Sequence, residues 1–143
     1  MENQQDFYIS TDKSKMDIEI IHKYLSEESY WAKGISKEIV EKSVANSFCF
    51  GVFYHDRQIG FAKVITDFTT IAYLGDVFIL DKIRGLGLSK LLMETIMHHP
   101  ELQGLRRWIL LTADAHELYR KFGWSNINDP SRWMEVHTKN PYQ

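Results

Sequence analysis

A short basic turn with two glycines joins an apolar strand to an amphipathic helix in the middle of this chain. The strand ends at residues 77–80, and the helix begins after Gly87. The first backbone N–H groups of a helix have no partners within the helix and carry a partial positive charge. Gly85 and Gly87 let a ligand approach the bare backbone, and Arg84 adds a fixed positive charge. This order predicts a binding site for a phosphate or pyrophosphate group.

Two common nucleotide-binding loops do not fit this turn. A P-loop needs four residues between its glycines, followed by Gly-Lys-Ser/Thr, and the turn lacks that spacing. A dinucleotide-binding loop needs a third glycine where the chain has Lys90. It also needs an acidic residue about 20 positions further on, where the chain has Arg107. Both of these nucleotide-binding sites are therefore excluded.

The turn resembles the acyl-CoA pyrophosphate loop of the GNAT superfamily of N-acetyltransferases. The family pattern is Arg or Gln, two residues, Gly, one residue, and then Gly or Ala. The chain has Arg84, Gly87 and Ser89 at these three positions. Ser89 departs from the pattern, but it is small enough for a phosphate to approach. The resemblance implies that acetyl-CoA binds here, through Arg84, Gly85, Leu86, Gly87, Leu88 and Ser89.

A second motif follows a strand expected at residues 108–111. GNAT proteins typically have Asn-x-x-Ala-x-x-Leu-Tyr-x-Lys-x-Gly-Phe at this place. Thr112 replaces the asparagine and Trp124 replaces the phenylalanine. The last glycine is also expected to end a helix in the left-handed conformation. The chain matches the pattern in register at Ala115, Leu118, Tyr119, Lys121 and Gly123.

The two motifs stand in the family's order within an alternating pattern of strands and helices. Hydrophobic periodicity and turn residues predict strands at 7–10, 48–54, 58–66, 71–80 and 108–111, a terminal hairpin or strand pair at 124–136, and helices at about 16–25, after Ser36, after Gly87 and at 115–121. The resemblance covers essentially the whole chain. It implies an α/β (mixed α+β) GNAT fold with a mixed, mostly antiparallel sheet of six or seven strands. The fourth and fifth strands are expected to be parallel and to splay apart, and about four helices should flank the sheet.

Length and composition fit one domain over residues 1–143. The chain is 44% hydrophobic and 25% charged, as is usual for globular proteins. A net charge of −2 argues against a nucleic-acid partner. No apolar stretch approaches the roughly 18 residues of a membrane span. A single cysteine and the lack of a visible secretory signal favour a cytoplasmic location.

The resemblance implies that a primary amine, on a small molecule or a peptide, attacks the thioester of acetyl-CoA directly in a ternary complex. The pantetheine arm would pair with strand backbone near Phe78 and Ile79. Tyr119 matches the family's tyrosine that protonates the leaving thiolate. A phenol of pKa about 10 can protonate a thiolate whose thiol has a pKa of about 8.5. The alternative for Tyr119 is a purely structural core residue.

The acceptor amine, with a pKa of about 10.4, must lose a proton before it attacks. Asp76 is the first candidate for the base or for a carboxylate that holds a relay water. Asp67 is the second candidate, and a third interpretation uses neither. Tyr30 and Trp31 lie between the first two helices and could wall the acceptor pocket. Trp31 could equally close the core.

Other functions stay open at this point. The same fold could form a non-catalytic acyl-CoA-binding module or sensor, and the sequence defines neither the acyl chain length nor the acceptor. No metal is expected, because His98 and His99 lack a third ligand nearby. Cys49 lies in an apolar run and is expected to be buried. An exposed C-terminal strand would also suit a homodimer.

Overall fold

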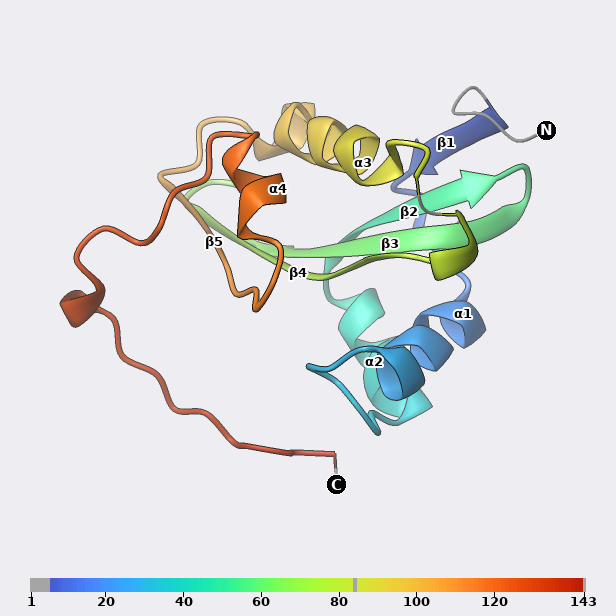
Figure 1. The fold of residues 1–143 in the computed structure, drawn as a ribbon, viewed down its shortest axis with the longest axis horizontal. Helices are drawn as coiled ribbons and strands as arrows, with labels where there is room; N and C mark the ends of the chain where they lie inside the picture. Colours follow the sequence, from blue (N-terminus) through green and yellow to red (C-terminus); the bar gives the residue numbers. More distant parts are fainter. Residues whose placement is uncertain (1–5, 84, 143) are drawn as a thin grey trace.

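A computed structural model describes residues 6–83 and 85–142 and contains one mixed sheet of five strands (Figure 1). The strands lie side by side in chain order, β1-β2-β3-β4-β5. The first four pair antiparallel, and β4 and β5 pair in parallel through the helical crossover predicted from the sequence. Their bounds are β1 Phe7–Ser10, β2 Phe48–Tyr54, β3 Arg57–Thr66, β4 Ile71–Ile79 and β5 Arg107–Leu110.

Four α-helices cover the two faces of this sheet (Figure 1). One face carries α1 (Ile18–Lys23), which continues into a π-helical turn at Tyr24–Glu28, and α2 (Lys37–Ala45). The other face carries α3 (Leu88–Met97) and α4 (His116–Arg120). Ser36 caps α2 by accepting the N–H of Ile39, as its place before the helix predicted. Short 3-10 turns lie at Lys13–Lys15, Asp81–Ile83, Pro100–Leu102 and Pro130–Arg132.

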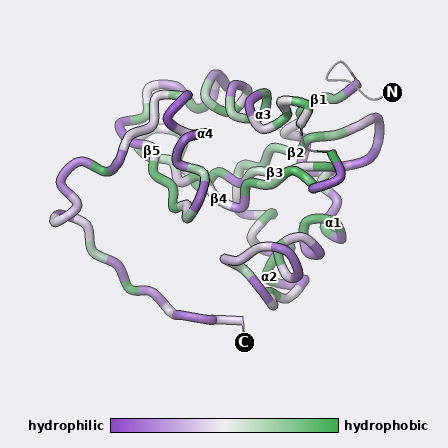
Figure 2. The backbone as a smooth tube through the Cα atoms, viewed as in Figure 1, coloured by the Kyte–Doolittle hydropathy of each residue, from purple (hydrophilic) through white to green (hydrophobic). Residues whose placement is uncertain are grey.

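Each face of the sheet has its own hydrophobic core, and the central strands contribute to both. The α3 side buries Phe50, Leu74, Leu92 and Ile96, among others. The α1–α2 side buries Ile21, Leu25, Val40, Phe61 and Phe78, among others. The central strands are accordingly the most continuously apolar part of the sheet (Figure 2). Because both faces are covered, the strands are held rigidly enough to position side chains at their ends.

A β-bulge in β4 changes which side chains face which core. The register between β3 and β4 shifts between Phe61 and Lys63, and Asp76 within the bulge has a positive φ of 53°. Leu74 and Ile79 both belong to the α3-side core, although they are an odd number of positions apart. An unbroken strand would place them on opposite faces. The extra residue of the bulge therefore turns Asp76 toward the α1–α2 face.

The predicted terminal hairpin is absent from the described residues, so the sheet has five strands and not six or seven. After α4 the chain forms only the 3-10 turn at Pro130–Arg132 and then runs away from the sheet (Figure 1). Met134 and Val136 are fully exposed, at 96% and 103%. The alternating pattern of residues 124–136 was recognised in the sequence. Within residues 6–83 and 85–142, however, the backbone of this segment pairs with no other strand. Pattern alone does not determine pairing.

Candidate active site

The sheet opens between β4 and β5. The two strands pair only from Ile71 with Arg107 to Leu74 with Leu110, whereas β4 continues to Ile79. Past Leu74, the described part of β4 therefore has no strand on its β5 side. Backbone N–H and C=O groups in such a gap require partners, and an extended ligand can supply them. The structure thus has the splay expected between its fourth and fifth strands.

The two predicted backbone-binding residues lie in this open part of β4. The side chains of Phe78 and Ile79 are 3% and 5% exposed, so both are core residues. Phe78 stacks on Tyr24 at a centroid distance of 4.0 Å. What these residues can offer a ligand is main chain rather than side chain. This agrees with the kind of contact predicted for them.

The glycine turn leads into α3 with two residues in the left-handed conformation. Gly85 has a φ of 93°, and Gly87, the N-cap of α3, has a φ of 73°. A Cβ atom at Gly85 would meet no heavy atom within 4 Å, so its backbone faces open space. The side chain of Leu88 is buried and anchors the first turn of the helix in the α3-side core. Open glycine backbone before a ten-residue helix is an arrangement that fits a phosphate group.

Two of the remaining residues predicted for this turn, Leu86 and Ser89, are partly buried. Leu86 is partly buried and packs against the α3-side core. Ser89 is partly exposed in the first turn of α3. Arg84, predicted to add the positive charge, lies outside the described residues. The fit of the turn to a phosphate therefore rests on residues 85–89.

The second motif forms the turn between β5 and α4. The hydroxyl of Thr112 accepts the N–H of Ala115 at 3.0 Å, so threonine closes this turn in place of the family's asparagine. Gly123 ends α4 with a φ of 90°. The N–H of Trp124 reaches the carbonyl of Tyr119, and that of Gly123 reaches Arg120, which is the Schellman pattern. The predicted helix-ending role of Gly123 is confirmed.

Tyr119 projects from α4 into the protein and is 8% exposed. Its ring lies 5.9 Å from that of Trp124, measured between centroids. Burial, with smaller contributions from Tyr30 and Asp114, raises the pKa of Tyr119 to about 12. The phenol therefore keeps its proton throughout the physiological range. A group in this state can donate a proton but cannot act as a base at neutral pH.

Tyr30 and Trp31 bridge the two sides of the splay. The N–H of Ala113, in the β5–α4 turn, donates to the Tyr30 hydroxyl at 2.9 Å. The indole N–H of Trp31 donates to Asp76 in the β4 bulge at 2.8 Å. The two rings meet edge to face with centroids 5.0 Å apart. Both are substantially exposed, at 59% and 40%, so Trp31 does not close the core.

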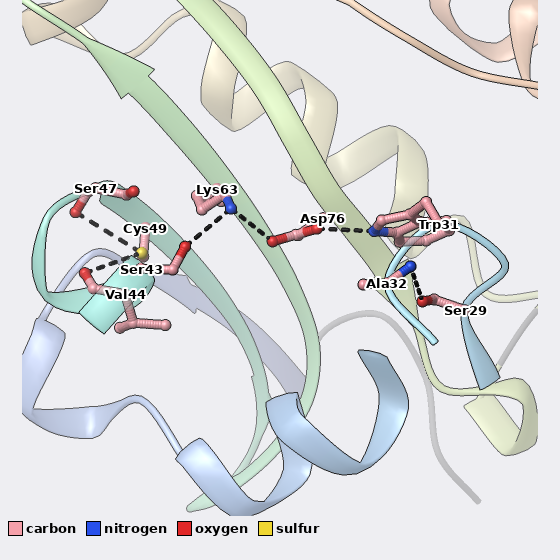
Figure 3. Close-up of polar contacts among 9 residues, drawn as sticks. All are labelled: Ser29, Trp31, Ala32, Ser43, Val44, Ser47, Cys49, Lys63 and Asp76. Atoms are coloured by element: carbon pink, nitrogen blue, oxygen red, sulfur yellow. Dashed lines mark hydrogen bonds and ion pairs between the residues drawn. The ribbon is translucent and has the colours of Figure 1, made fainter. Parts of the chain in front are cut away.

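Asp76 belongs to a polar network within the α1–α2 side (Figure 3). One carboxylate oxygen accepts from Trp31, and the other lies 2.8 Å from the ammonium of Lys63. Lys63 also donates to the Ser43 hydroxyl at 2.9 Å. The Asp76 and Lys63 side chains are only 14% and 15% exposed. Asp76 is thus a fixed negative group at the mouth of the splay.

Sequence reasoning missed Lys63, Ser43 and Tyr73. Lys63 is a lone charge within the otherwise apolar strand segment 59–65, and that isolation was the available signal. Burial, and to a lesser extent the charge of Asp76, raises the pKa of the Tyr73 phenol. Ser43 carried no signal, because a serine on a helix surface is ordinary.

Asp67, the second candidate base, builds a turn instead. Its carboxylate accepts the N–H groups of Thr69, Thr70 and Ile71 and the hydroxyl of Thr70. These hydrogen bonds, the hydroxyl contact first, hold the pKa of Asp67 far below its usual value. A carboxylate so strongly stabilised in its charged form is a poor base. The geometry therefore favours Asp76 over Asp67.

Cys49 is buried, and the described residues form no metal-binding group. Cys49 is 1% exposed, and burial raises the pKa of its thiol to about 11, so it is the buried residue that was predicted. Over residues 6–83 and 85–142, no group of three or more His, Cys, Asp or Glu side chains could hold a metal ion. Within the same ranges, none of the helices has the length and apolar character of a membrane-crossing segment.

A family model described as "Acetyltransferase (GNAT) family" matches residues 18–124, a range that contains both motifs and the whole β4–β5 splay. The chain belongs to the GNAT acetyltransferase family. This confirms the family expected from the sequence, and GNAT proteins use acetyl-CoA. The matched range also includes the Tyr30–Trp31 bridge and the Asp76 network.

Known proteins resemble this chain over most of its length. A crystal structure of a candidate GNAT acetyltransferase from Xanthomonas campestris pv. campestris is 47% identical and has a TM-score of 0.93, covering 95% of this chain and 96% of its own. A candidate acetyltransferase from Gibberella zeae is 30% identical over 81% of this chain and 77% of its own. A predicted acetyltransferase from Clostridium acetobutylicum, solved with acetyl-CoA, shares the fold at 13% identity and a TM-score of 0.66, over 92% of this chain and 94% of its own.

Proposed function

We propose that this protein transfers the acetyl group of acetyl-CoA to a primary amine in a ternary complex. The observation that carries the proposal is the splay between β4 and β5, which is spanned by the hydrogen bonds of Tyr30 to the turn before α4 and of Trp31 to Asp76. The helix α4 carries Tyr119, and β4 leads to the glycine turn of α3. The cofactor side of the splay comprises residues 85–89. The acceptor side comprises Tyr30, Trp31, Ser43, Lys63 and Asp76.

The cofactor side fits the diphosphate of acetyl-CoA, and the neighbouring open edge of β4 fits its pantetheine arm. The backbone of Gly85 faces open space, and the two glycines with positive φ bring the chain into the first turn of α3, where a phosphate group would bind. The open edge of β4 near Phe78 and Ile79 can hydrogen-bond an extended pantetheine arm. Acetyl-CoA supplies the activated acetyl group when it is bound.

Tyr119 holds the proton that the departing sulfur needs. During transfer a bond forms between the amine nitrogen and the carbonyl carbon, and the carbon–sulfur bond breaks. The phenol is protonated at neutral pH, as any tyrosine is, and burial widens that range by raising its pKa to about 12. It can give this proton to the thiolate from its Oη and regain one from solvent.

Asp76 orients the acceptor and a relay water rather than removing the amine proton alone. Both of its oxygens already accept from donors, Trp31 and Lys63, which stabilise the ionised carboxylate. Because Lys63 already balances the charge of this carboxylate, Asp76 would act on the acceptor as a fixed hydrogen-bond acceptor and not as a net negative charge. It can also hold a water that passes the amine proton to solvent before attack.

Tyr30 and Trp31 form the aromatic wall on which the acceptor would rest. They are rigid, because each is hydrogen-bonded to a different side of the splay. Their exposed faces suit a small amine or the side chain of a peptide. The cytoplasmic location, the single-domain organisation and the absence of nucleic-acid and membrane partners stay predictions.

The test is release of free CoA thiol from acetyl-CoA in the presence of a panel of primary amines. We expect the wild-type protein to turn over with at least one amine and Tyr119→Phe to lose most of that turnover. Tyr54→Phe, on β2 and away from the splay, serves as the matched control and should keep it. Acetyl-CoA binding without turnover on any amine would contradict the proposal and favour a non-catalytic acyl-CoA sensor.

A further inference from the structure

A row of three side chains crosses the sheet on its α1–α2 face, at the point where β4 and β5 begin to separate. It consists of Ile65 on β3, Tyr73 on β4 and Ile109 on β5, because Tyr73 pairs in register with both of the others. Leu74 and Leu110, the next residues along β4 and β5, pack in the α3-side core. Since neighbouring residues of a strand point to opposite faces, these three point to the α1–α2 face. They are called the cross-strand row.

The cross-strand row is accessible, although α1 and α2 bury much of the same face. Ile65 is 49% exposed, and Tyr73 and Ile109 are partly exposed. Among the described residues, the α1–α2 side core includes Phe61 of β3 and Phe78 of β4 but none of the row. In Figure 1, α1 and α2 lie toward the end of the sheet that is away from β5. The row is therefore an open apolar surface on which a ligand can lie.

Gly75 connects the cross-strand row to the acceptor side. A Cβ atom at Gly75 would lie only 3.0 Å from Cε1 of Tyr73, so the edge of the Tyr73 ring occupies the space beside this glycine. The ring thus points along β4 toward the bulge that carries Asp76. Gly75 is also the cross-strand partner of Lys63, whose ammonium pairs with Asp76. The row and the Asp76 network therefore form one continuous surface.

We propose that the cross-strand row binds the body of the acceptor, and that the acceptor is a primary amine on a flat, apolar body. The amine would lie beside Asp76 and the body on the Tyr73 ring, between Ile65 and Ile109. This inference rests on the proposed acetyl transfer, because it names the class of amine that receives the group. Tyr73 is then a specificity-determining residue, which acts on binding of the amine and not on the transfer step.

The charges beside the row favour an apolar body over one with further ammonium groups. Asp76 is the only carboxylate in the sequences of β3, β4 and β5, and Lys63 already balances it at 2.8 Å. Asp67, in the turn between β3 and β4, uses its carboxylate to accept hydrogen bonds from that turn. A polyamine along the row would therefore find no free carboxylate on these three strands for its second ammonium group. An aromatic body would instead bury apolar surface against the Tyr73 ring.

The first test compares amines by release of free CoA thiol from acetyl-CoA. We expect the wild type to prefer phenethylamine to spermidine and to glucosamine. Tyr73→Ala should raise the KM of phenethylamine about tenfold, with kcat and the Kd of acetyl-CoA unchanged. Ile65→Asp, at a half-exposed position, should raise this KM as well. Tyr8→Ala removes an exposed tyrosine from β1 at the opposite edge of the sheet and should leave the KM unchanged.

The second test detects binding without turnover, by NMR of the isoleucine methyl groups. We expect phenethylamine to shift the signals of Ile65 and Ile109 but not that of Ile39, which is exposed on α2. If no amine is acetylated but the two signals shift, acetyl transfer is refuted and the binding surface is supported.

Three results would overturn the inference. The first is that phenethylamine shifts neither the Ile65 nor the Ile109 signal. The second is a preference for spermidine or glucosamine over phenethylamine. The third is an unchanged KM of phenethylamine in both Tyr73→Ala and Ile65→Asp. A circular dichroism spectrum equal to that of the wild type verifies that each variant is folded.

Discussion

The cofactor side of the splay is one continuous segment, whereas the acceptor side is assembled from distant parts of the chain. Residues 85–89 are neighbours in sequence, and their conformation follows from the glycines themselves. Trp31 and Asp76 are 45 positions apart, and Tyr30 and Ala113 are 83 apart. The acceptor side therefore exists only when the whole sheet is folded in the correct register. Changes on the two sides should have different consequences.

Tyr119 should show the largest effect, because it is the proposed proton donor in the transfer step. We expect Tyr119→Phe to lower kcat by roughly 10² to 10⁴-fold, since the departing thiolate loses its proton donor. The Kd of acetyl-CoA should stay unchanged. Steady-state kinetics combined with calorimetry separate the two effects. Near-normal kcat in this variant would make Tyr119 a core residue only.

Removing Lys63 should affect folding more strongly than any single change on the cofactor side. Lys63→Met leaves the largely buried Asp76 carboxylate without its ion pair and should cost about 3 kcal/mol of unfolding free energy. Adding Asp76→Leu should recover most of that loss. Urea denaturation measures both. Lys37→Met, which breaks an exposed ion pair with Glu19, should cost less than about 1 kcal/mol of unfolding free energy. If Lys63→Met and Lys37→Met lost equal unfolding free energy, the buried pair would be no more important than the exposed one.

Gly87→Val should affect the cofactor side alone. A β-branched residue at a φ of 73° is strained and its side chain blocks the approach to the helix N-terminus. We expect the Kd of acetyl-CoA to rise by roughly tenfold to a hundredfold, with the KM of the amine unchanged. Gly104→Val, at a φ of 79° but away from the splay, imposes similar strain and should not weaken acetyl-CoA binding.

High pH should destabilise the protein through Tyr119. Its folded pKa of about 12 lies above the value of about 10 for an unfolded tyrosine. The stability is therefore fully present below pH 10 and is lost as the pH rises from about 10 to 12, by up to roughly 2 to 3 kcal/mol. Denaturant unfolding at about pH 9, 10, 11 and 12 should show that the wild type loses more unfolding free energy with rising pH than Tyr119→Phe does. Equal losses in the two proteins would contradict the prediction.

The smallest effect is expected at Trp31. Trp31→Phe keeps an aromatic wall but removes the N–H that reaches Asp76. Because the ring is 40% exposed, we expect only about a fivefold rise in the KM of the amine. The Kd of acetyl-CoA should not change. A variant that altered acetyl-CoA binding instead would show that the two sides are not separate.

The difference between a continuous segment and a site assembled from distant residues also explains how much could be predicted from the sequence. The glycine turn and the end of α4 at Gly123 follow from local patterns, whereas the splay was expected from the family resemblance, and the structure has all three. The pairing of Lys63 with Asp76 could not be predicted, because it depends on a bulge whose position is set by the register of two strands. Local chemistry is readable from a sequence, whereas register is not.

The C-terminal residues 129–142 show that an alternating pattern alone does not identify the sheet edge that a segment joins. Residues 133–137 have the alternation of a strand, and a terminal strand was predicted around them. The described residues form only the turn at Pro130–Arg132 there. An alternating segment specifies which face is apolar, but it does not specify which sheet edge it joins.

Calorimetric titration with acetyl-CoA tests the central claim most directly. The titration is repeated on a variant that combines Arg84→Ala with Gly87→Glu, which removes the predicted charge of the turn and blocks its backbone. We predict saturable binding by the wild type and no detectable binding by the variant. No binding by the wild type, or equal binding by both proteins, would contradict the assignment of the α3 turn as the cofactor site.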